Sequence, residues 1–218
     1  MELTWLGHSC FRLRGKDATV ITDPPAPSTG YSTGRLTADI VTISHKHPGH
    51  SHAAGVAGEP KVVDGPGEYE IKQTLISGVQ TFHDNERGKR LGHNTVYLIT
   101  LDDIHICHLG DLGDKLDNRA QEALDGCDVL LVPVGGGNAL NAEQAAEVIA
   151  QLEPKIVVPM HYVTPAYKGG GPNEPPLEGV ERFCREMGVE PPEPAAKLTI
   201  TPTSLPATTQ IVLLNYRG

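Results

Sequence analysis

The chain is poor in aromatic residues, which make up 5% of its 218 residues and include one Trp and three Phe. Its core must therefore be filled mostly by Val, Ile, Leu and Ala. Hydrophobic residues make up 39% and charged residues 21% of the chain. This balance excludes wholesale disorder and allows one substantial core. The 24 glycines and 18 prolines predict many turns and long connections.

No apolar run is long enough to span a bilayer, and residues 1–6 alternate like a β-strand instead of forming a basic segment followed by an apolar one. We therefore expect a cytoplasmic protein with no membrane partner. The net charge of −9 repels polyanions and argues against nucleic-acid binding. It does not exclude a small-molecule substrate held by local groups. No oligomeric state is predicted.

Signals for several other site types are missing. The cysteines form no C-x-x-C pair, so we expect free, mostly buried thiols at Cys10, Cys107, Cys127 and Cys184. No G-x-S-x-G elbow surrounds a serine, which argues against a serine hydrolase. The glycine runs 135–137 and 169–171 lack a G-K-[ST] ending, so they are expected to be flexible loops near a cleft and not phosphate loops.

Strand-like runs fill the first half of the chain, and helical spacing is concentrated in the second. The expected strands are 3–6, 10–13, 18–22, 40–44, 61–63, 68–71, 75–82, 95–100, 104–109, 129–134, 156–160, 197–201 and 210–216. The expected helices are 118–124, 142–151 (with Asn141 as N-cap) and 178–187. Continuous apolar strands such as 129–134 indicate sheets covered on both faces. We predict one α+β domain over residues 1–218, with two packed sheets and helices outside.

Histidines gather where predicted strands end. After strand 40–44 come His45, His47 and His50, and the later strand ends carry His83, His108 with Asp111, and His161. Strand ends hold side chains in fixed geometry, and neutral imidazole and carboxylate are natural ligands of Zn²⁺ and similar ions. One isolated histidine is more often an ordinary polar residue, but the whole set predicts a metal site.

These motifs resemble those of the metallo-β-lactamase superfamily along nearly the whole chain. The matching segments are Trp5-Leu6-Gly7-His8-Ser9, Ile21-Thr22-Asp23-Pro24, His45-Lys46-His47-Pro48-Gly49-His50, His108-Leu109-Gly110-Asp111-Leu112-Gly113 and Val157-Val158-Pro159-Met160-His161-Tyr162. The branch that matches best is the group of small metal-dependent hydrolases similar to ascorbate-6-phosphate lactonase. The resemblance implies a four-layer αββα sandwich of two mixed β-sheets flanked by helices.

The resemblance also implies one or two divalent metal ions per chain, with Zn²⁺ as the first expectation and Mn²⁺ or Fe²⁺ as alternatives. The implied ligands are His45, His47 and His83 for a first metal, His50 and His161 for a second, and Asp111 as the bridge between them. His83 is preferred to His108 because it precedes the Gly-Asp element by a strand or two, whereas His108 is expected behind the ligands or within the sheet. Asp111 and His161 are the expected catalytic residues.

The main motif departs from the family pattern at Gly49, where the family carries an aspartate that ligates the second metal. Glycine cannot do so, which leaves a second site that is weak, empty or completed by water. Nearby, Asp23 is expected either to accept a hydrogen bond from a ligand histidine or to form a turn before proline. His8 is expected either at the rim of the site or as an ordinary strand-end residue, and His52 is expected to be solvated.

The implied function is hydrolysis of a small ester, lactone or phosphoester by a metal-bound hydroxide, because a divalent metal lowers the pKa of water from about 15.7 towards 7. Two alternatives remain open. Loss of the aspartate at Gly49 could mark a catalytically degenerate protein that binds metal or ligand. Diiron oxidoreductases share the fold, although they typically carry glutamate where His47 stands. The basic stretch Arg87, Lys89 and Arg90 is interpreted as a solvated loop and not as an anion clamp.

Overall fold

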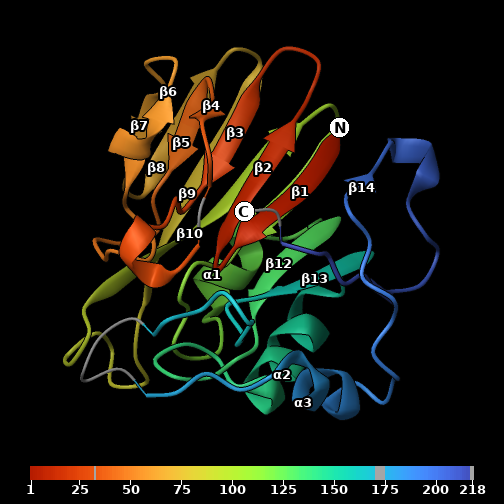
Figure 1. The fold of residues 1–218 in the computed structure, drawn as a ribbon. Coiled ribbons are helices and arrows are strands. Elements are labelled where there is room, and N and C mark those ends of the chain that lie inside the picture. Colours follow the sequence, from red (N-terminus) through yellow and green to blue (C-terminus); the bar gives the residue numbers. More distant parts are fainter. Residues whose placement is uncertain (32, 170–174, 217–218) are drawn as a thin grey trace.

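Two large β-sheets pack face to face in the computed structural model, which describes residues 1–31, 33–169 and 175–216 (Figure 1). Of the expected glycine-rich loop 169–171, only Gly169 therefore falls within the described residues. The sheets share one large buried cluster, whose members run from Leu3 to Leu214. The prediction of two packed mixed sheets in an α+β protein is confirmed.

The first sheet has six strands, in the order β14-β1-β2-β3-β5-β7. They are β1 (Glu2–Gly7), β2 (Cys10–Arg14), β3 (Thr19–Thr22), β5 (Ile40–Thr42), β7 (Lys61–Val63) and β14 (Leu198–Thr199). Strands β14 to β3 pair antiparallel, and β3, β5 and β7 pair parallel. The parallel strands β3 and β5 therefore end at the same edge of the sheet.

The second sheet has seven strands, in the order β15-β13-β12-β11-β10-β9-β8. They are β8 (Gly67–Ile71), β9 (Thr74–Phe82), β10 (His93–Leu101), β11 (Ile104–His108), β12 (Val129–Pro133), β13 (Ile156–Met160) and β15 (Gln210–Ile211). Strands β8 to β11 pair antiparallel, whereas β11, β12, β13 and β15 pair parallel. This sheet is mixed as well, and β11 and β13 end at one edge.

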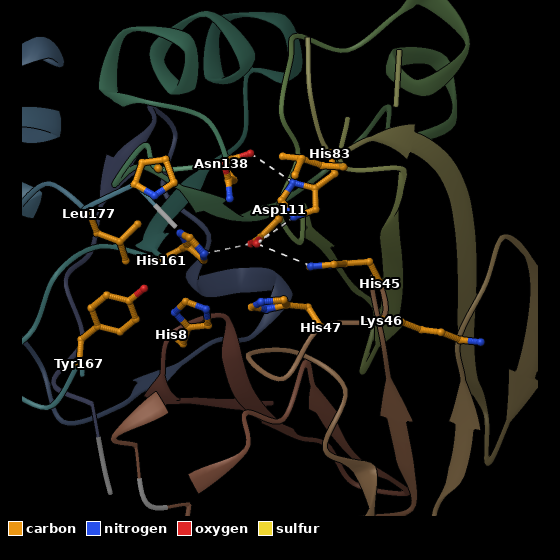
Figure 2. Close-up of a pocket in the computed structure, with 13 residues that line it drawn as sticks. His8, His45, Lys46, His47, His83, Asp111, Asn138, His161, Tyr167 and Leu177 are labelled. Carbon is orange, nitrogen blue, oxygen red and sulfur yellow. Dashed lines mark hydrogen bonds and ion pairs between the residues drawn. The ribbon is translucent and has the colours of Figure 1, made fainter. Parts of the chain in front are cut away.

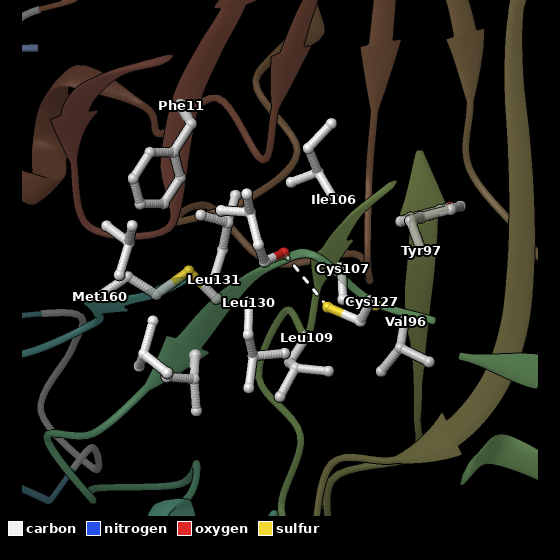
Figure 3. Packing of buried hydrophobic residues seen from close by; sticks show 14 of the residues in the cluster. Phe11, Val96, Tyr97, Ile106, Cys107, Leu109, Cys127, Leu130, Leu131 and Met160 are labelled. Atoms are coloured by element: carbon white, nitrogen blue, oxygen red, sulfur yellow. Dashed lines mark hydrogen bonds between the residues drawn. The ribbon is translucent and has the colours of Figure 1, made fainter. Parts of the chain in front are cut away.

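Aliphatic side chains from both sheets fill the space between them, as the shortage of aromatics predicts. Figure 3 shows part of this cluster, with Phe11 from the first sheet and Leu131 and Met160 from the second. Strands β12 and β13 are buried at every position, so both faces of the second sheet are covered there. All four cysteines are buried and free, which confirms the prediction of free thiols.

The three α-helices of the described residues come from the second half of the chain. They are α1 (Asn118–Ala123), α2 (Ala142–Leu152) and α3 (Val180–Glu186). The strands that α1 and α2 contact most, β9 and β12, belong to the second sheet, and α3 packs against α2. Helices therefore cover the second sheet, and no helix in the described part of the chain has the length and apolar character needed to cross a membrane.

The outer face of the first sheet is covered differently. A two-stranded sheet of β4 (Leu36–Thr37) and β6 (Val56–Ala57) contributes Leu36 and Val56 to a second buried cluster, which also contains Ile21 and Val41 of the first sheet. Neighbouring residues Val20 and Ile40 belong to the large cluster instead. Since successive side chains of a strand point to opposite faces, the first sheet is buried on both sides. Three short 3₁₀ turns complete the described elements, at Pro27–Thr29, Ala53–Gly55 and Pro202–Ser204.

Candidate metal centre

The histidine cluster forms where strands of both sheets end. From the first sheet, β1 leads to His8, β3 to Asp23, and β5 to His45, His47 and His50; from the second, β9 leads to His83, β11 to Asp111, and β13 to His161. Figure 2 shows labelled members of this set pointing toward a common centre. Parallel strands that end at one edge bring their following loops together, so residues more than 100 positions apart in the chain become neighbours.

Asp111 lies at the middle of the cluster and faces histidines on two sides. Its Oδ2 atom is 3.1 Å from His50 Nε2, 3.5 Å from His83 Nε2 and 3.8 Å from His45 Nε2. Its other oxygen, Oδ1, is 3.3 Å from His161 Nε2. The two carboxylate oxygens thus face different groups of histidines, as a carboxylate that bridges two metal ions would.

Hydrogen bonds behind the cluster fix the orientation of two histidines. His50 Nδ1 lies 2.8 Å from Asp23 Oδ2, and His83 Nδ1 lies 3.2 Å from the carbonyl oxygen of Asn138. An Nδ1–H that donates to an oxygen leaves the Nε2 lone pair free for a metal. Asp23 is held in turn by the backbone N–H and hydroxyl of Ser44. Of the two interpretations of Asp23, the structure therefore shows the hydrogen bond to a histidine of the cluster.

Asn94 of β10 positions Asp111, although no sequence motif marks this residue as functional. Its side-chain amide donates to the carbonyl of Leu109 and to the hydroxyl of Thr81, both at 2.9 Å. Its Oδ1 accepts the backbone N–H of Asp111 at 3.0 Å. The one available sign was a polar residue at the start of an otherwise apolar run, which is also typical of an ordinary strand end.

Three residues of the cluster have left-handed backbone conformations. The φ angles are 53° at His8, 38° at Asp23 and 53° at His161. The turns at His8 and His161 are joined, because the N–H of His161 donates to the carbonyl of His8 at 3.2 Å. Trp5 Nε1 donates to the same carbonyl at 2.9 Å. Such conformations cost on the order of 1 kcal/mol each and persist where surrounding contacts enforce them, as they often do at functional sites.

Charges within the cluster separate the protonation states of the histidines. Burial alone would lower the pKa of His50, but Asp111 and Asp23 outweigh it and raise that pKa to about 10. Burial, together with the neighbouring His50, lowers the pKa of His45 to about 3. Burial opposes ionisation of Asp111, yet His161 and His50 hold the pKa of its carboxyl well below its usual range. At neutral pH these shifts favour a protonated His50 between the carboxylates of Asp111 and Asp23 when no metal is bound.

A cavity of about 270 Å³ opens above the cluster. Its floor is formed by the polar residues His8, His45, His47, His83, Asp111 and His161. Its remaining walls include Leu91, Tyr167, Pro175 and Leu177. The cavity is therefore lined by candidate metal ligands on one part of its surface and by partly apolar residues elsewhere. Its volume suits a small molecule.

Residues 2–161 match the sequence model of the β-lactamase superfamily domain. The chain belongs to this superfamily. A relative from Methanoculleus marisnigri, named a UPF0173 metal-dependent hydrolase, is 31% identical over 189 residues, which cover 75% of this chain and 82% of the relative.

Solved structures of the superfamily show the same fold. A protein from Thermotoga maritima, proposed to be a zinc-dependent hydrolase of the metallo-β-lactamase superfamily, superimposes with a TM-score of 0.80, at 34% identity and 99% coverage of both chains. A diiron β-hydroxylase from Streptomyces venezuelae also superimposes, with a TM-score of 0.63 at 14% identity, over 92% of this chain and 54% of that one. That second similarity shows the fold alone.

The donor atoms of this superfamily member fit a divalent metal. Buried atoms without a hydrogen-bond partner include His45 Nε2, His50 Nε2, Asp111 Oδ1 and one ring nitrogen each of His8 and His161. An unpaired buried polar atom costs about 1–3 kcal/mol, so five on neighbouring side chains require an explanation, which a bound ion would supply for the atoms that face it. Among the residues that the structure describes, three sets have ligand atoms within 4.8 Å of one another: His8, His50 and His161; His45, His47 and His50; and His45, His83 and Asp111.

All the residues that the sequence named as ligands lie in these sets, whereas several other candidates lie elsewhere. His108 is fully buried, with Nε2 2.8 Å from the carbonyl of Ser9, and it belongs to none of the sets. His52 is half-buried beside the turn at Ala53 and was expected to be solvated. Arg87, Lys89 and Arg90 are exposed and are not among the described residues that line the cavity.

Proposed function

We propose that this metallo-β-lactamase superfamily member hydrolyses a small neutral ester or lactone with the help of divalent metal ions. The proposal depends on one observation, the convergence of unpaired buried histidine nitrogens and a carboxylate on the floor of a small cavity. The proposed ligands are His45, His47 and His83 at one position, His50 and His161 at the other, and Asp111 between them.

The bound ions would supply a water of lowered pKa and an electrophile for the substrate carbonyl. The side chains have complementary tasks. Asp111 stays ionised because its pKa lies far below neutrality, so its oxygens can only accept hydrogen bonds and would orient a water by one of its O–H groups. His161 faces Asp111 Oδ1 at 3.3 Å from the far side of the cluster. We assign the catalytic roles to these two residues.

The cavity walls favour a neutral substrate over a phosphoester. Among the described residues that line the cavity, Lys46 is the one cationic side chain, and Figure 2 shows its amine directed away from the cluster. Leu91, Pro175 and Leu177 add apolar side chains to the lining of the cavity. A phosphate monoester would carry its negative charge into a site without a positioned cation besides the metals, which disfavours binding.

Zinc is the ion that we propose, because imidazole-rich sites with carboxylates suit it and because the similar Thermotoga maritima protein is proposed to be zinc-dependent. The same donors accept Mn²⁺ or Fe²⁺. A cytoplasmic location also belongs to this proposal, and the four free buried thiols support it, since reducing compartments keep cysteines unpaired.

The proposal is tested by measuring the metal content of the protein and its hydrolysis of model substrates. Protein purified without added metal or chelator is analysed by mass spectrometry, next to His47→Ala and to an Arg87→Ala control on the exposed loop. We expect one or two ions per chain, lost partly in His47→Ala only, and turnover of p-nitrophenyl acetate or γ-butyrolactone above that of p-nitrophenyl phosphate. Metal bound without turnover of any ester or lactone would favour the degenerate alternative, and a metal-free protein that takes up neither Zn²⁺ nor Mn²⁺ would overturn the proposal.

A further inference from the structure

His8 lies inside the histidine cluster and not at its rim. It is 3% exposed, and its ring centroid is 4.2 Å from that of His161 and 4.8 Å from that of His50. One ring nitrogen of each of these three residues lies within 4.8 Å of the others. The set therefore has the dimensions of a metal site that uses His8 as a third imidazole.

The imidazole of His8 occupies the space that a side chain at position 49 would enter. A Cβ atom built on Gly49 would lie 2.8 Å from His8 Nε2 and 3.1 Å from His47 Nδ1. Real Cβ contacts are essentially never below 3.0 Å, so a side chain at position 49 and the present position of His8 exclude each other. The glycine makes room for the histidine.

The surroundings of His8 fix its ring but leave one nitrogen unpaired. The backbone is held in its left-handed turn by Trp5 and His161, which both contact its carbonyl. The ring of Tyr167 stacks on the imidazole, with centroids 5.7 Å apart and planes 14° from parallel. His8 Nδ1 is buried without a hydrogen-bond partner. An unpaired buried nitrogen on a fixed ring is rare in folded proteins, and a bound ion is one partner that would account for it.

We propose that His8 is a ligand of the second metal ion, together with His50, His161 and Asp111, and that it replaces the side chain that Gly49 lacks. This inference rests on the proposed metal-dependent function. It gives the second position three imidazoles and one carboxylate as donors, which are ligand types that suit Zn²⁺.

The first experiment removes the imidazole without straining the turn. His8→Gly keeps the left-handed backbone accessible, because glycine populates positive φ freely. Metal content after dialysis against Zn²⁺, and the absorption spectrum on titration with Co²⁺, report on binding independently of activity. We expect the wild type to bind two ions and His8→Gly to bind one, with the affinity for the second ion lowered by about 100-fold or more.

A rescue experiment separates a ligand from a merely structural residue. Gly49 is not among the glycines with positive φ, so an aspartate there meets His8 but no backbone strain. Gly49→Asp alone should disturb the cluster, whereas the double variant His8→Gly/Gly49→Asp should regain the second ion through the new carboxylate. His52→Ala, which removes a nearby half-buried histidine outside the candidate sets, is the matched control and should bind two ions.

The outcomes are distinct. Two ions in both the wild type and His8→Gly, with equal affinity, would overturn the role of His8 and leave the proposed function intact, as would a wild type that binds only one ion. A wild type without metal would overturn both. If circular dichroism shows that His8→Gly is unfolded, the double variant tests the inference instead. A folded double variant that binds two ions supports the inference, and a folded double variant that binds one ion contradicts it.

Discussion

Asp111 shows how much the chemistry of this site depends on a single carboxylate. Histidines from both sheets approach its two oxygens, at 3.1 to 3.8 Å. Asn94 fixes the backbone N–H of the same residue. An amide in its place would keep the shape but offer one oxygen and one N–H group, and a donor cannot ligate a metal.

Asp111→Asn should therefore lose the bridge between the two proposed metal positions. We expect metal content to fall and ester hydrolysis to drop by about 100-fold or more, as when a single stabilising group is removed from a polar active site. Asp114→Asn, three residues on and not among the described residues lining the cavity, is the control. Equal activity in Asp111→Asn and in the wild type would count against the assigned role.

His108 lies outside the candidate ligand sets, and we predict that it affects acid stability instead. Burial lowers the pKa of its imidazole below the usual 6.5, so the unfolded chain takes up a proton more readily than the folded one. The contribution of the neutral ring to the free energy of unfolding is therefore fully present above about pH 6.5. As the pH falls below that value, the free energy of unfolding decreases by up to about 1.4 kcal/mol per pH unit for one group.

His108→Gln should reduce this decrease in the free energy of unfolding at low pH. Glutamine does not titrate, and its amide can still donate to the Ser9 carbonyl. Urea unfolding with chelator present, at pH 7.5 and pH 5.5, isolates the effect from metal release. We expect the wild type to lose about 1 kcal/mol more than the variant between these two pH values. Equal losses would show that His108 does not titrate on unfolding.

At the scale of elements, one side chain ties the two sheets together beside the site. The hydroxyl of Tyr97, from β10 of the second sheet, donates to the carbonyl of Ile43 at 2.8 Å, and it is 3.2 Å from the carbonyl of Val63. Both carbonyls lie at the ends of first-sheet strands, and Tyr97 is fully buried. Its hydroxyl therefore fixes where the loop with His45 begins.

Tyr97→Phe removes this hydroxyl and keeps the ring. We expect a loss of about 1–2 kcal/mol in the free energy of unfolding, since buried acceptors lose their partner, and a weaker hold on metal at the His45 loop. Chemical denaturation and Zn²⁺ titration measure the two effects. Tyr69→Phe, where the half-buried hydroxyl donates to the carbonyl of Gly65 in the loop before β8, should leave metal affinity unchanged.

Helix α2 begins with a capping box, and its N-cap Asn141 is the residue that the sequence predicted. The Asn141 side chain accepts the N–H of Gln144 at 2.9 Å, and the Gln144 side chain accepts the N–H of Asn141 at 3.1 Å. Asn141→Ala should cost about 1 kcal/mol of stability, measured by thermal unfolding. Metal content should not change, because neither residue lines the cavity.

At the scale of the whole molecule, the proposed metal ions join the two sheets. His45, His47 and His50 follow a strand of the first sheet, whereas His83, Asp111 and His161 follow strands of the second. An ion held by both sets would therefore add to the contacts that keep the sheets packed. Ligands that bind only the folded state stabilise it by mass action.

Removal of metal should lower the melting temperature without changing the number of transitions. With Zn²⁺ at about 100 times its dissociation constant the stabilisation is about 2.7 kcal/mol, which for a chain of this size corresponds to about 5–10 °C. Calorimetry with and without EDTA measures the shift. Two separate transitions in the apo protein would contradict the prediction of one domain over residues 1–218.

Local patterns were enough to predict most elements. Apolar runs predicted β7 (Lys61–Val63) and β13 (Ile156–Met160) at their observed bounds. The two-residue strands β4 and β6 were missed because they are too short to show a period. The last runs were predicted too long, since β14 and β15 pair over only two residues each, and the length of an edge pairing is set by the neighbouring strand.

The sequence by itself determined which chemistry is present, because histidines and an aspartate at strand ends are visible as a pattern without any structure. It also determined the superfamily, through short motifs that are each continuous in the chain. Only the tertiary structure decided which of these groups meet. Position 8 and position 49 are unrelated in sequence, yet the strand ends bring the imidazole of one into the space left by the other. Such complementarity depends on the packing of two sheets, and packing has no local signature.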